Sequence, residues 1–168
     1  MTTAGDLAFL HTVGIFAELD ATHLQALAER LRPRALKRGE VLFREGDGGR
    51  ELYIVRAGTV LVSKPVLGRV EQVLARLGPG ELLGDMSLFD GEPRSATATA
   101  ESDAAVLCLD PEGLRLLTEA SPRTAAAFFF QLVRVFTARL RESGNLVAEV
   151  TRWGLEATGL DVDGTHRR

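Results

Sequence analysis

Several features that mark specialised protein classes are scarce in this chain of 168 residues. Its single cysteine rules out a disulfide framework within the chain. Its 20 lysines and arginines do not outnumber its 23 aspartates and glutamates, and the formal net charge of −3 argues against a basic surface for nucleic acid. No apolar run reaches membrane-spanning length, and the N-terminus shows no basic leader. We therefore expect a globular cytoplasmic protein that binds neither nucleic acid nor a membrane.

Groups that carry catalysis or hold metals are also sparse. His11, His23 and His166 are far apart in the sequence, whereas a metal site needs ligands that converge. There is no Ser-His-Asp order and no pair of carboxylates placed for hydrolysis. An enzyme of the cupin type would need histidines and carboxylates together among its strands, and all three histidines lie outside the expected strands. We therefore expect no metal, no cofactor and no enzymatic activity.

Short β-rich runs separated by turn residues fill the middle of the chain, from Arg34 to Leu109. Turns that recur about every ten residues are typical of an antiparallel sandwich or barrel. Glycines occupy these turns, and a tight turn often needs the positive φ that glycine adopts without strain. The glycines at such turns include Gly39, Gly46 and Gly58. The pattern predicts a jelly roll, with strands over Glu40–Arg44, Leu52–Val55, Thr59–Lys64, Val70–Leu77, Ala96–Ala100 and Ala104–Leu109.

Helices are expected before the strands. Asp20 is a candidate N-cap for a helix over Ala21–Leu31, which Pro33 would end. The apolar stretch Leu7–Phe16 fits a short helix and a turn that pack on the main body. A frayed terminus is the alternative for this stretch.

Two helices are expected after the strands. Asp110 followed by Pro111 predicts the start of a helix that ends near Ala120. A longer helix is expected over Pro122–Glu142, and its apolar residues spread over more than one face. A second copy of the chain is the natural partner for the additional apolar surface, which predicts a homodimer. The alternative is that the chain's own termini cover it.

The sequence predicts that the long helix breaks at residues 143–145, where serine, glycine and asparagine follow one another. A short amphipathic helix is expected to follow over Leu146–Ala157, and the polar end from Gly159 is expected to be disordered. The predicted segments are an N-terminal helical segment, residues 1–20, a main domain, residues 21–143, and a tail, residues 144–168.

The stretch Leu82–Ala98 combines residues suited to a phosphate and a sugar. Gly84 lets the backbone come close to a ligand, and Asp85 offers a carboxylate to hydroxyl groups. Arg94 and Ser95 offer a positive charge and a hydroxyl donor to an anion. A carboxylate for a sugar diol and a guanidinium for a phosphate are what a ribose phosphate requires.

This stretch resembles the phosphate-binding cassette of the cyclic nucleotide-binding domain. Catabolite-activator-type regulators, cyclic-nucleotide-gated channels and regulatory subunits of cyclic-nucleotide-dependent kinases share that module. The family pattern is Gly-Glu-x-small-Leu, a short spacer and Pro-Arg-(Ser/Ala/Thr)-Ala-Thr, and it stands here as GDMSL at residues 84–88 and PRSAT at residues 93–97. The resemblance implies an α+β fold in which an antiparallel β jelly-roll barrel is flanked by N-terminal helices and a long C-terminal helix.

The resemblance also implies roles toward a cyclic nucleotide, cAMP or cGMP. Arg94 and Ser95 would bind the phosphate. Asp85 stands where the family usually has glutamate, which accepts from the ribose 2′-hydroxyl, so the shorter side chain must shift the backbone or reach through water. The ribose and backbone contacts of the cassette would come from Gly84, Asp85, Met86 and Ser87.

The base would lie against the long helix if the chain follows the family. An alignment carried from Arg94 onward puts Arg139, Leu140 and Arg141 near the base. An arginine can stack on a purine face or donate to its edge. Each arginine could equally be a solvated charge near the end of a helix, where cations are favoured. The sequence favours neither adenine nor guanine.

The function that the resemblance implies is a stand-alone cyclic nucleotide receptor. In the family the cassette contracts around the phosphate and the long helix moves to cap the base. Catabolite-activator-type regulators continue into a helix-turn-helix domain, for which too few residues follow here, so we expect no DNA binding by this chain. Its output would pass through a dimer rearrangement or a protein partner. The alternative is a degenerate domain that binds no nucleotide and serves in dimerisation or protein interaction.

Overall fold

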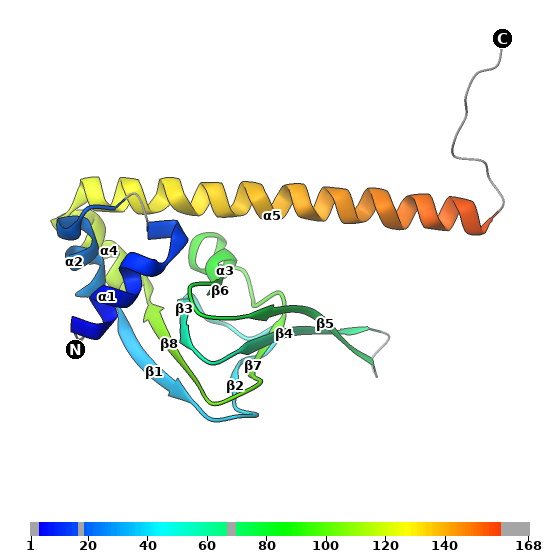
Figure 1. Ribbon diagram of the computed structural model, residues 1–168, viewed down its shortest axis with the longest axis horizontal. Coiled ribbons are helices and arrows are strands. Elements are labelled where there is room, and N and C mark those ends of the chain that lie inside the picture. Colours follow the sequence, from blue (N-terminus) through cyan, green and yellow to red (C-terminus); the bar gives the residue numbers. More distant parts are fainter. Residues whose placement is uncertain (1–3, 17–18, 67–69, 159–168) are drawn as a thin grey trace, which may run out of the picture. The chain divides into compact units, whose positions relative to one another are not determined.

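The protein was analysed as a computed structural model, which describes residues 4–16, 19–66 and 70–158. The chain forms two compact units, residues 1–128 and residues 129–168. The first unit holds the strands, the helices α1 to α4 and the beginning of α5, and the second holds the remainder of α5 (Figure 1).

Two antiparallel four-stranded sheets form the centre of the first unit. One has the strand order β1-β8-β3-β6 and the other has the order β2-β7-β4-β5 (Figure 1). Strands distant in sequence are therefore neighbours, as in a jelly roll, and the predicted fold class is confirmed. The strands are β1 (Arg32–Leu36), β2 (Val41–Phe43), β3 (Leu52–Ala57), β4 (Val60–Val66), β5 (Val70–Leu77), β6 (Leu82–Leu83), β7 (Thr97–Ala100) and β8 (Ala104–Leu109).

One hydrophobic core joins the two sheets. Residues two positions apart on a strand point to the same face, which explains why Tyr53 and Val55 on β3 both enter this core. Each of the eight strands contributes at least one side chain, so the two sheets share one apolar interior. The buried core residues are Leu36, Leu42, Tyr53, Val55, Val60, Leu77, Leu83, Ala98, Ala100, Ala104 and Val106.

Strand β1 was not anticipated, because Pro33 reads as the end of a helix rather than as part of a strand. The preceding helix, α2, stops earlier than predicted, at Ala28 instead of Leu31. Strand β1 occupies an edge of its sheet and pairs only with β8 among the described strands. Proline is tolerated on an edge strand, because its missing N–H need not join a ladder.

The predicted helix starts are confirmed. The Asp20 carboxylate accepts from the His23 N–H and begins α2, and the Asp110 carboxylate accepts from the Gly113 N–H and begins α4. The stretch before α2 is folded rather than frayed, since α1 and a 3-10 turn lie within it. The helices of the first unit are α1 (Ala4–Thr12), η1 (Gly14–Phe16), α2 (Ala21–Ala28), α3 (Asp85–Asp90) and α4 (Pro111–Ala120).

Helix α5 corrects one prediction. It runs without interruption over Pro122–Ala157, so the break predicted at residues 143–145 is wrong (Figure 1). A glycine inside a helix costs only about 1 kcal/mol relative to alanine, which the long helical neighbours on both sides offset. The predicted disordered end, from Gly159, lies outside the described residues. The division into residues 1–20, 21–143 and 144–168 stays a prediction.

Candidate functional site

The cassette stretch runs from β6 through α3 to β7. Gly84 joins β6 to α3 in a left-handed conformation, with φ of 72°. A Cβ at this position would lie 2.6 Å from Arg94 Nη1 and 2.7 Å from the backbone oxygen of Glu51. Both the conformation and the close approach therefore require glycine. The glycine allows the backbone at the start of α3 to come close to the Arg94 side chain.

Helix α3 presents the predicted cassette residues in two directions. Asp85 and Ser87 are buried, whereas Met86 is 56% exposed. The Met86 side chain therefore faces solvent. Ser95 is exposed and lies just before β7.

Arg94 is the most enclosed of the predicted ligand-binding residues, at 3% exposed. Its Nη1 group donates to the carbonyl oxygens of Glu51, at 2.9 Å, and Gly84, at 3.0 Å. Its Nη2 group donates to the Glu51 carboxylate at 2.8 Å. Three hydrogen bonds to two residues thus fix the plane of the guanidinium. These bonds hold the guanidinium beside Gly84 and beside Glu51, the residue that precedes β3.

One polar atom of this guanidinium has no hydrogen-bond partner among the residues that the structure describes. Arg94 Nε is buried and unpaired. Leaving such a donor buried and unsatisfied costs about 1–3 kcal/mol. Nε lies on the same edge of the guanidinium as Nη2, and two such N–H groups side by side match two oxygens of a phosphate. The arrangement is suited to an oxyanion that approaches this edge.

Two aromatic rings surround the Arg94 charge. The guanidinium carbon lies 4.4 Å from the centre of the Phe43 ring and 5.7 Å from the centre of the Tyr53 ring. The two rings are themselves stacked, with their centres 6.0 Å apart. Burial raises the pKa of the Tyr53 hydroxyl, and the nearby Glu51 carboxylate adds to this shift. The aromatic faces stabilise the cation while keeping water away from it.

The backbone of Arg94 is held by the turn that follows β2. Arg94 N–H donates to the Asp47 carbonyl at 2.9 Å, and Gly46 N–H donates to the Arg94 carbonyl at 2.8 Å. The Asp47 carboxylate closes this turn by accepting from the Arg44 N–H at 2.8 Å. The turn therefore fixes the position of the Arg94 backbone. The two carbonyl groups and the two aromatic rings described above fix the position of its guanidinium.

The three residues predicted to contact the base lie in the second unit. Arg139, Leu140 and Arg141 follow one another on α5, and all three are exposed. They belong to a continuous helix rather than to its end, since α5 extends to Ala157. The proposed helix C-terminal role for the two arginines is therefore wrong. Their role toward a base stays a prediction.

Sequence reasoning missed the residues that position Arg94. Phe43 comes from β2 and Tyr53 from β3, and Glu51 is the residue just before β3; all three are far from the cassette in sequence. Gly49 is also close, because a Cβ there would lie 3.0 Å from Arg94 Nη2. The apolar run Leu52–Val55 indicates a buried strand, but without polar residues between its members it does not indicate which face Tyr53 takes. No local pattern joins Glu51 to an arginine on another loop.

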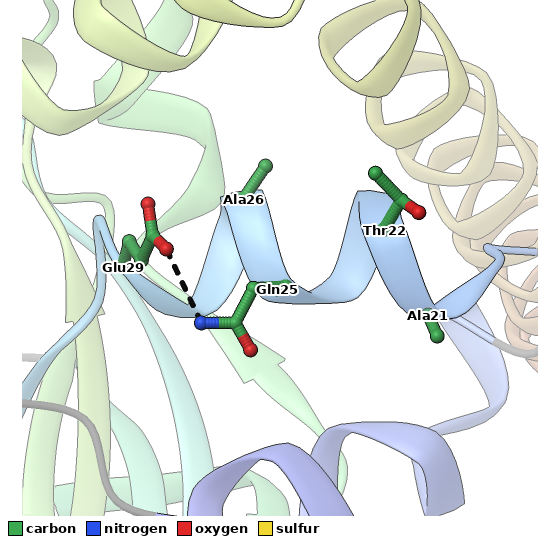
Figure 2. A pocket seen from close by; sticks show the side chains of 5 residues that line it. All are labelled: Ala21, Thr22, Gln25, Ala26 and Glu29. Carbon is green, nitrogen blue, oxygen red and sulfur yellow. Dashed lines mark hydrogen bonds between the residues drawn. The ribbon is translucent and has the colours of Figure 1, made fainter.

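A separate hollow lies along α2, away from the cassette residues in sequence. Figure 2 shows its lining side chains, among which the Gln25 amide donates to the Glu29 carboxylate at 3.2 Å. None of the predicted ligand-binding residues lines it. The Gln25 and Glu29 side chains therefore bond to each other, and neither is a buried charge. The lining residues are Ala21, Thr22, Gln25, Ala26 and Glu29.

Two further findings concern the described part of the chain. It contains no group of three or more histidine, cysteine, aspartate or glutamate residues that could hold a metal ion. Its helices, including the long α5, are too short or too polar to cross a membrane.

Comparison with known proteins matches the fold to a family. A model of the cyclic nucleotide-binding domain matches residues 33–121, which include the cassette and all of both sheets except Arg32. A crystal structure of a cyclic nucleotide-binding domain from Methylobacillus flagellatus has a TM-score of 0.75 and 28% sequence identity. The similarity covers 85% of this chain and 80% of that one.

Two characterised relatives share the same region. A CRP-like cAMP-activated global transcriptional regulator from Mycobacterium tuberculosis is 31% identical over 141 residues, which are 84% of this chain and 61% of the relative. A cyclic AMP receptor protein from Thermus thermophilus is 40% identical over 110 residues, which are 66% of this chain and 49% of the relative. The similarity thus spans about half to three fifths of the length of these relatives.

Proposed function

Because this chain belongs to the family of cyclic nucleotide-binding domains, we propose that it is a cytoplasmic receptor for cAMP or cGMP rather than an enzyme. The observation that carries the proposal is the buried edge of Arg94. Its Nε is buried without a partner, beside an Nη2 bonded to a single carboxylate oxygen. A cyclic phosphodiester has one negative charge and two free oxygens, which match these two donors.

The proposed roles divide the ligand among the cassette residues. Arg94 binds the phosphate, and the exposed Ser95 adds a hydroxyl or backbone donor. Gly84 admits the ligand close to the α3 backbone, to which Met86 and Ser87 contribute. Asp85 contacts the ribose directly or through water. The relatives whose names mention cAMP favour cAMP as the first ligand to test.

The proposed response is a change in the position of α5. A ligand that binds two positions of this helix with different affinity shifts their populations. Arg139, Leu140 and Arg141 are the proposed base contacts on it. All three residues are exposed, so their side chains are accessible to a ligand.

The proposal also includes a homodimer through α5. Apolar or small residues recur along this helix at alternating spacings of three and four, the repeat by which two helices pack side by side. The exposure of several members favours a second copy as the partner, because an identical helix presents the same repeat. The seam, as we name this row, consists of Val133, Phe136, Leu140, Ser143, Val147 and Val150.

For the 168 residues here the proposed output is a protein partner rather than DNA. The formal net charge of −3 supports this, because proteins that bind the phosphate backbone usually carry a clustered positive charge. The word "transcriptional" in the name of one relative describes that relative, of which this chain spans 61%. A DNA-binding assay with purified protein, with and without cAMP, would test this part of the proposal.

The central experiment is a calorimetric titration with cAMP and cGMP of the wild type and of Arg94→Gln. We expect micromolar or tighter binding of at least one nucleotide and a loss of about 100-fold in the variant, since one buried charged partner contributes roughly 2–5 kcal/mol. Arg76→Gln is the matched control, because Arg76 also pairs with a glutamate, at 2.9 Å, but is exposed. Thermal unfolding of each variant checks that the fold survives. Equal affinity in wild type and Arg94→Gln would refute the site.

A second candidate function is an interaction module that binds no nucleotide. Two observations favour it: aspartate stands at position 85, and a carboxylate of the chain already bonds to Arg94. This candidate predicts a folded dimer that gives no heat with either nucleotide. Asp85→Glu then separates the two explanations, because nucleotide binding gained by this variant would identify the short side chain as the cause.

A further inference from the structure

The contact between Glu51 and Arg94 joins a buried cation to a partly exposed anion. The two side chains approach to 2.8 Å, and their exposures are 2% for Arg94 and 38% for Glu51. The Glu51 backbone oxygen also accepts from Nη1, so the main chain at position 51 stays bonded to the arginine whatever the carboxylate does. The carboxylate can therefore leave toward solvent while the guanidinium remains in place.

The Glu51 carboxylate occupies half of the edge that an oxyanion would use. It accepts from Nη2 and leaves the neighbouring Nε without a partner. A phosphate that bonds to both donors must take the place of the carboxylate at Nη2. Two negative groups that share one donor also repel each other, so the exchange is competitive.

The residue next to this edge of the guanidinium is a glycine, Gly49. A Cβ at Gly49 would lie 3.0 Å from Nη2, 3.1 Å from Glu51 Oε2 and 3.2 Å from Nε. Any side chain there would crowd the carboxylate and both donors at once. Because residue 49 is glycine, no side chain crowds the carboxylate and the two donors on this side.

We propose that the Glu51 carboxylate is an internal competitor for the anion site of Arg94 and sets the affinity and selectivity of that site. An anion that displaces the carboxylate gains binding free energy only when it bonds to Nε as well as to Nη2. The site therefore favours a phosphate with two free oxygens over an anion that bonds through one. The inference rests on the proposed function for the identity of the natural ligand. The competition itself concerns any oxyanion.

The test uses Glu51→Gln, which keeps the size and an oxygen acceptor but removes the charge. Inorganic phosphate is titrated into the full chain at constant ionic strength, and the ¹H–¹⁵N resonance of Arg94 Nε is followed. Arg94→Lys, which lacks this resonance, assigns it. We expect Glu51→Gln to bind phosphate about fivefold more tightly than the wild type, the range set by partly exposed ion pairs.

The matched control is Glu101→Gln. Glu101 pairs with Arg76 at 2.9 Å and its side chain is 39% exposed, nearly the values for Glu51, but among the described residues no hydrogen bond or ion pair joins it to Arg94. Its phosphate affinity should equal that of the wild type. If Glu51→Gln fails to fold, Glu51→Asp serves instead, because a carboxylate one methylene shorter also weakens the bond to Nη2.

The outcomes separate this inference from the proposed function. Tighter phosphate binding in Glu51→Gln without any nucleotide binding would support the competitor and refute the receptor. Nucleotide binding with equal or weaker phosphate affinity in Glu51→Gln would support the receptor and overturn the competitor, making Glu51 a supporting group. If Glu51 is a competitor and the chain is also a nucleotide receptor, cAMP or cGMP should bind about fivefold more tightly to Glu51→Gln than to the wild type.

Discussion

The two halves of the proposed ligand site are built in opposite ways. In the phosphate half, Arg94 is 3% exposed and is held by two carbonyls, a carboxylate and two aromatic rings. In the base half, Leu140 is 74% exposed and its two arginine neighbours are exposed as well. Changes in the phosphate half therefore alter folding and binding together. Changes in the base half should alter binding or assembly alone.

The largest expected effect is that of Gly84→Ala. The new Cβ would meet Arg94 Nη1 at 2.6 Å and a backbone oxygen at 2.7 Å, and the φ of 72° would also be strained. Because backbone must move, we expect a loss of about 3 kcal/mol or more in unfolding free energy. Nucleotide binding should be lost with it. Urea unfolding and calorimetry measure the two effects.

Gly39→Ala is the control for the strain alone. Gly39 has a φ of 83°, but a Cβ there would meet nothing within 4 Å. The expected cost is about 1–2 kcal/mol, with nucleotide affinity unchanged. If Gly84→Ala and Gly39→Ala lost the same free energy of unfolding, the close packing of Gly84 on Arg94 would contribute nothing to stability. The contrast between the halves would then be weaker than we argue.

The next effect compares arginine-to-lysine changes in the two halves. Lysine keeps the charge but cannot reproduce the planar fork that bonds to Glu51, Gly84 and a phosphate. We expect Arg94→Lys to lose about 100-fold in nucleotide affinity, roughly 2.7 kcal/mol. Arg139→Lys should lose less than about fivefold, because an exposed contact contributes at most about 1 kcal/mol. Comparable losses at both positions would show that the base half is as closely fitted as the phosphate half.

A smaller effect is expected in the assembly of the second unit. Val147→Glu puts a charge into the seam on α5, whereas Ala148→Glu puts the same charge on the next residue, which points away from the seam. The first change should weaken the dimer about tenfold, and the second should leave it nearly unchanged, as measured by sedimentation at several concentrations. A monomeric wild type would contradict the seam altogether.

The contrast between the halves also explains what the sequence could predict. The cassette is contiguous, so GDMSL and PRSAT identify Gly84 and Arg94 directly. The surroundings of Arg94 are brought together by strand pairing, and nothing near Glu51 indicates its bond to an arginine on another loop. The helix starts at Asp20 and Asp110 were predictable because capping is local. The break predicted at residues 143–145 was wrong because a long helix tolerates a glycine that local helix propensity disfavours.

The smallest effect appears only at high pH and concerns the strands beneath Arg94. Burial raises the pKa of the Cys108 thiol from 9.0 to about 11, with the Glu51 and Asp110 charges adding to it. Burial likewise raises the pKa of Tyr53, which pairs with Cys108 across β3 and β8. A raised pKa means that the folded chain disfavours the anion. The stability from these groups is therefore complete below about pH 9 and is lost as the pH rises toward 11.

Urea unfolding at a series of pH values, in the presence of a reductant, measures this loss. Each group contributes at most about 1.4 kcal/mol per pH unit, and less where solvent reaches it. Cys108→Ala should fall less steeply than the wild type between pH 9 and 11, with no difference in slope near pH 7. Equal slopes would mean that the thiol is not shielded. The contrast in burial between the halves would then rest on Arg94 and the residues that bond to it, and not on Cys108.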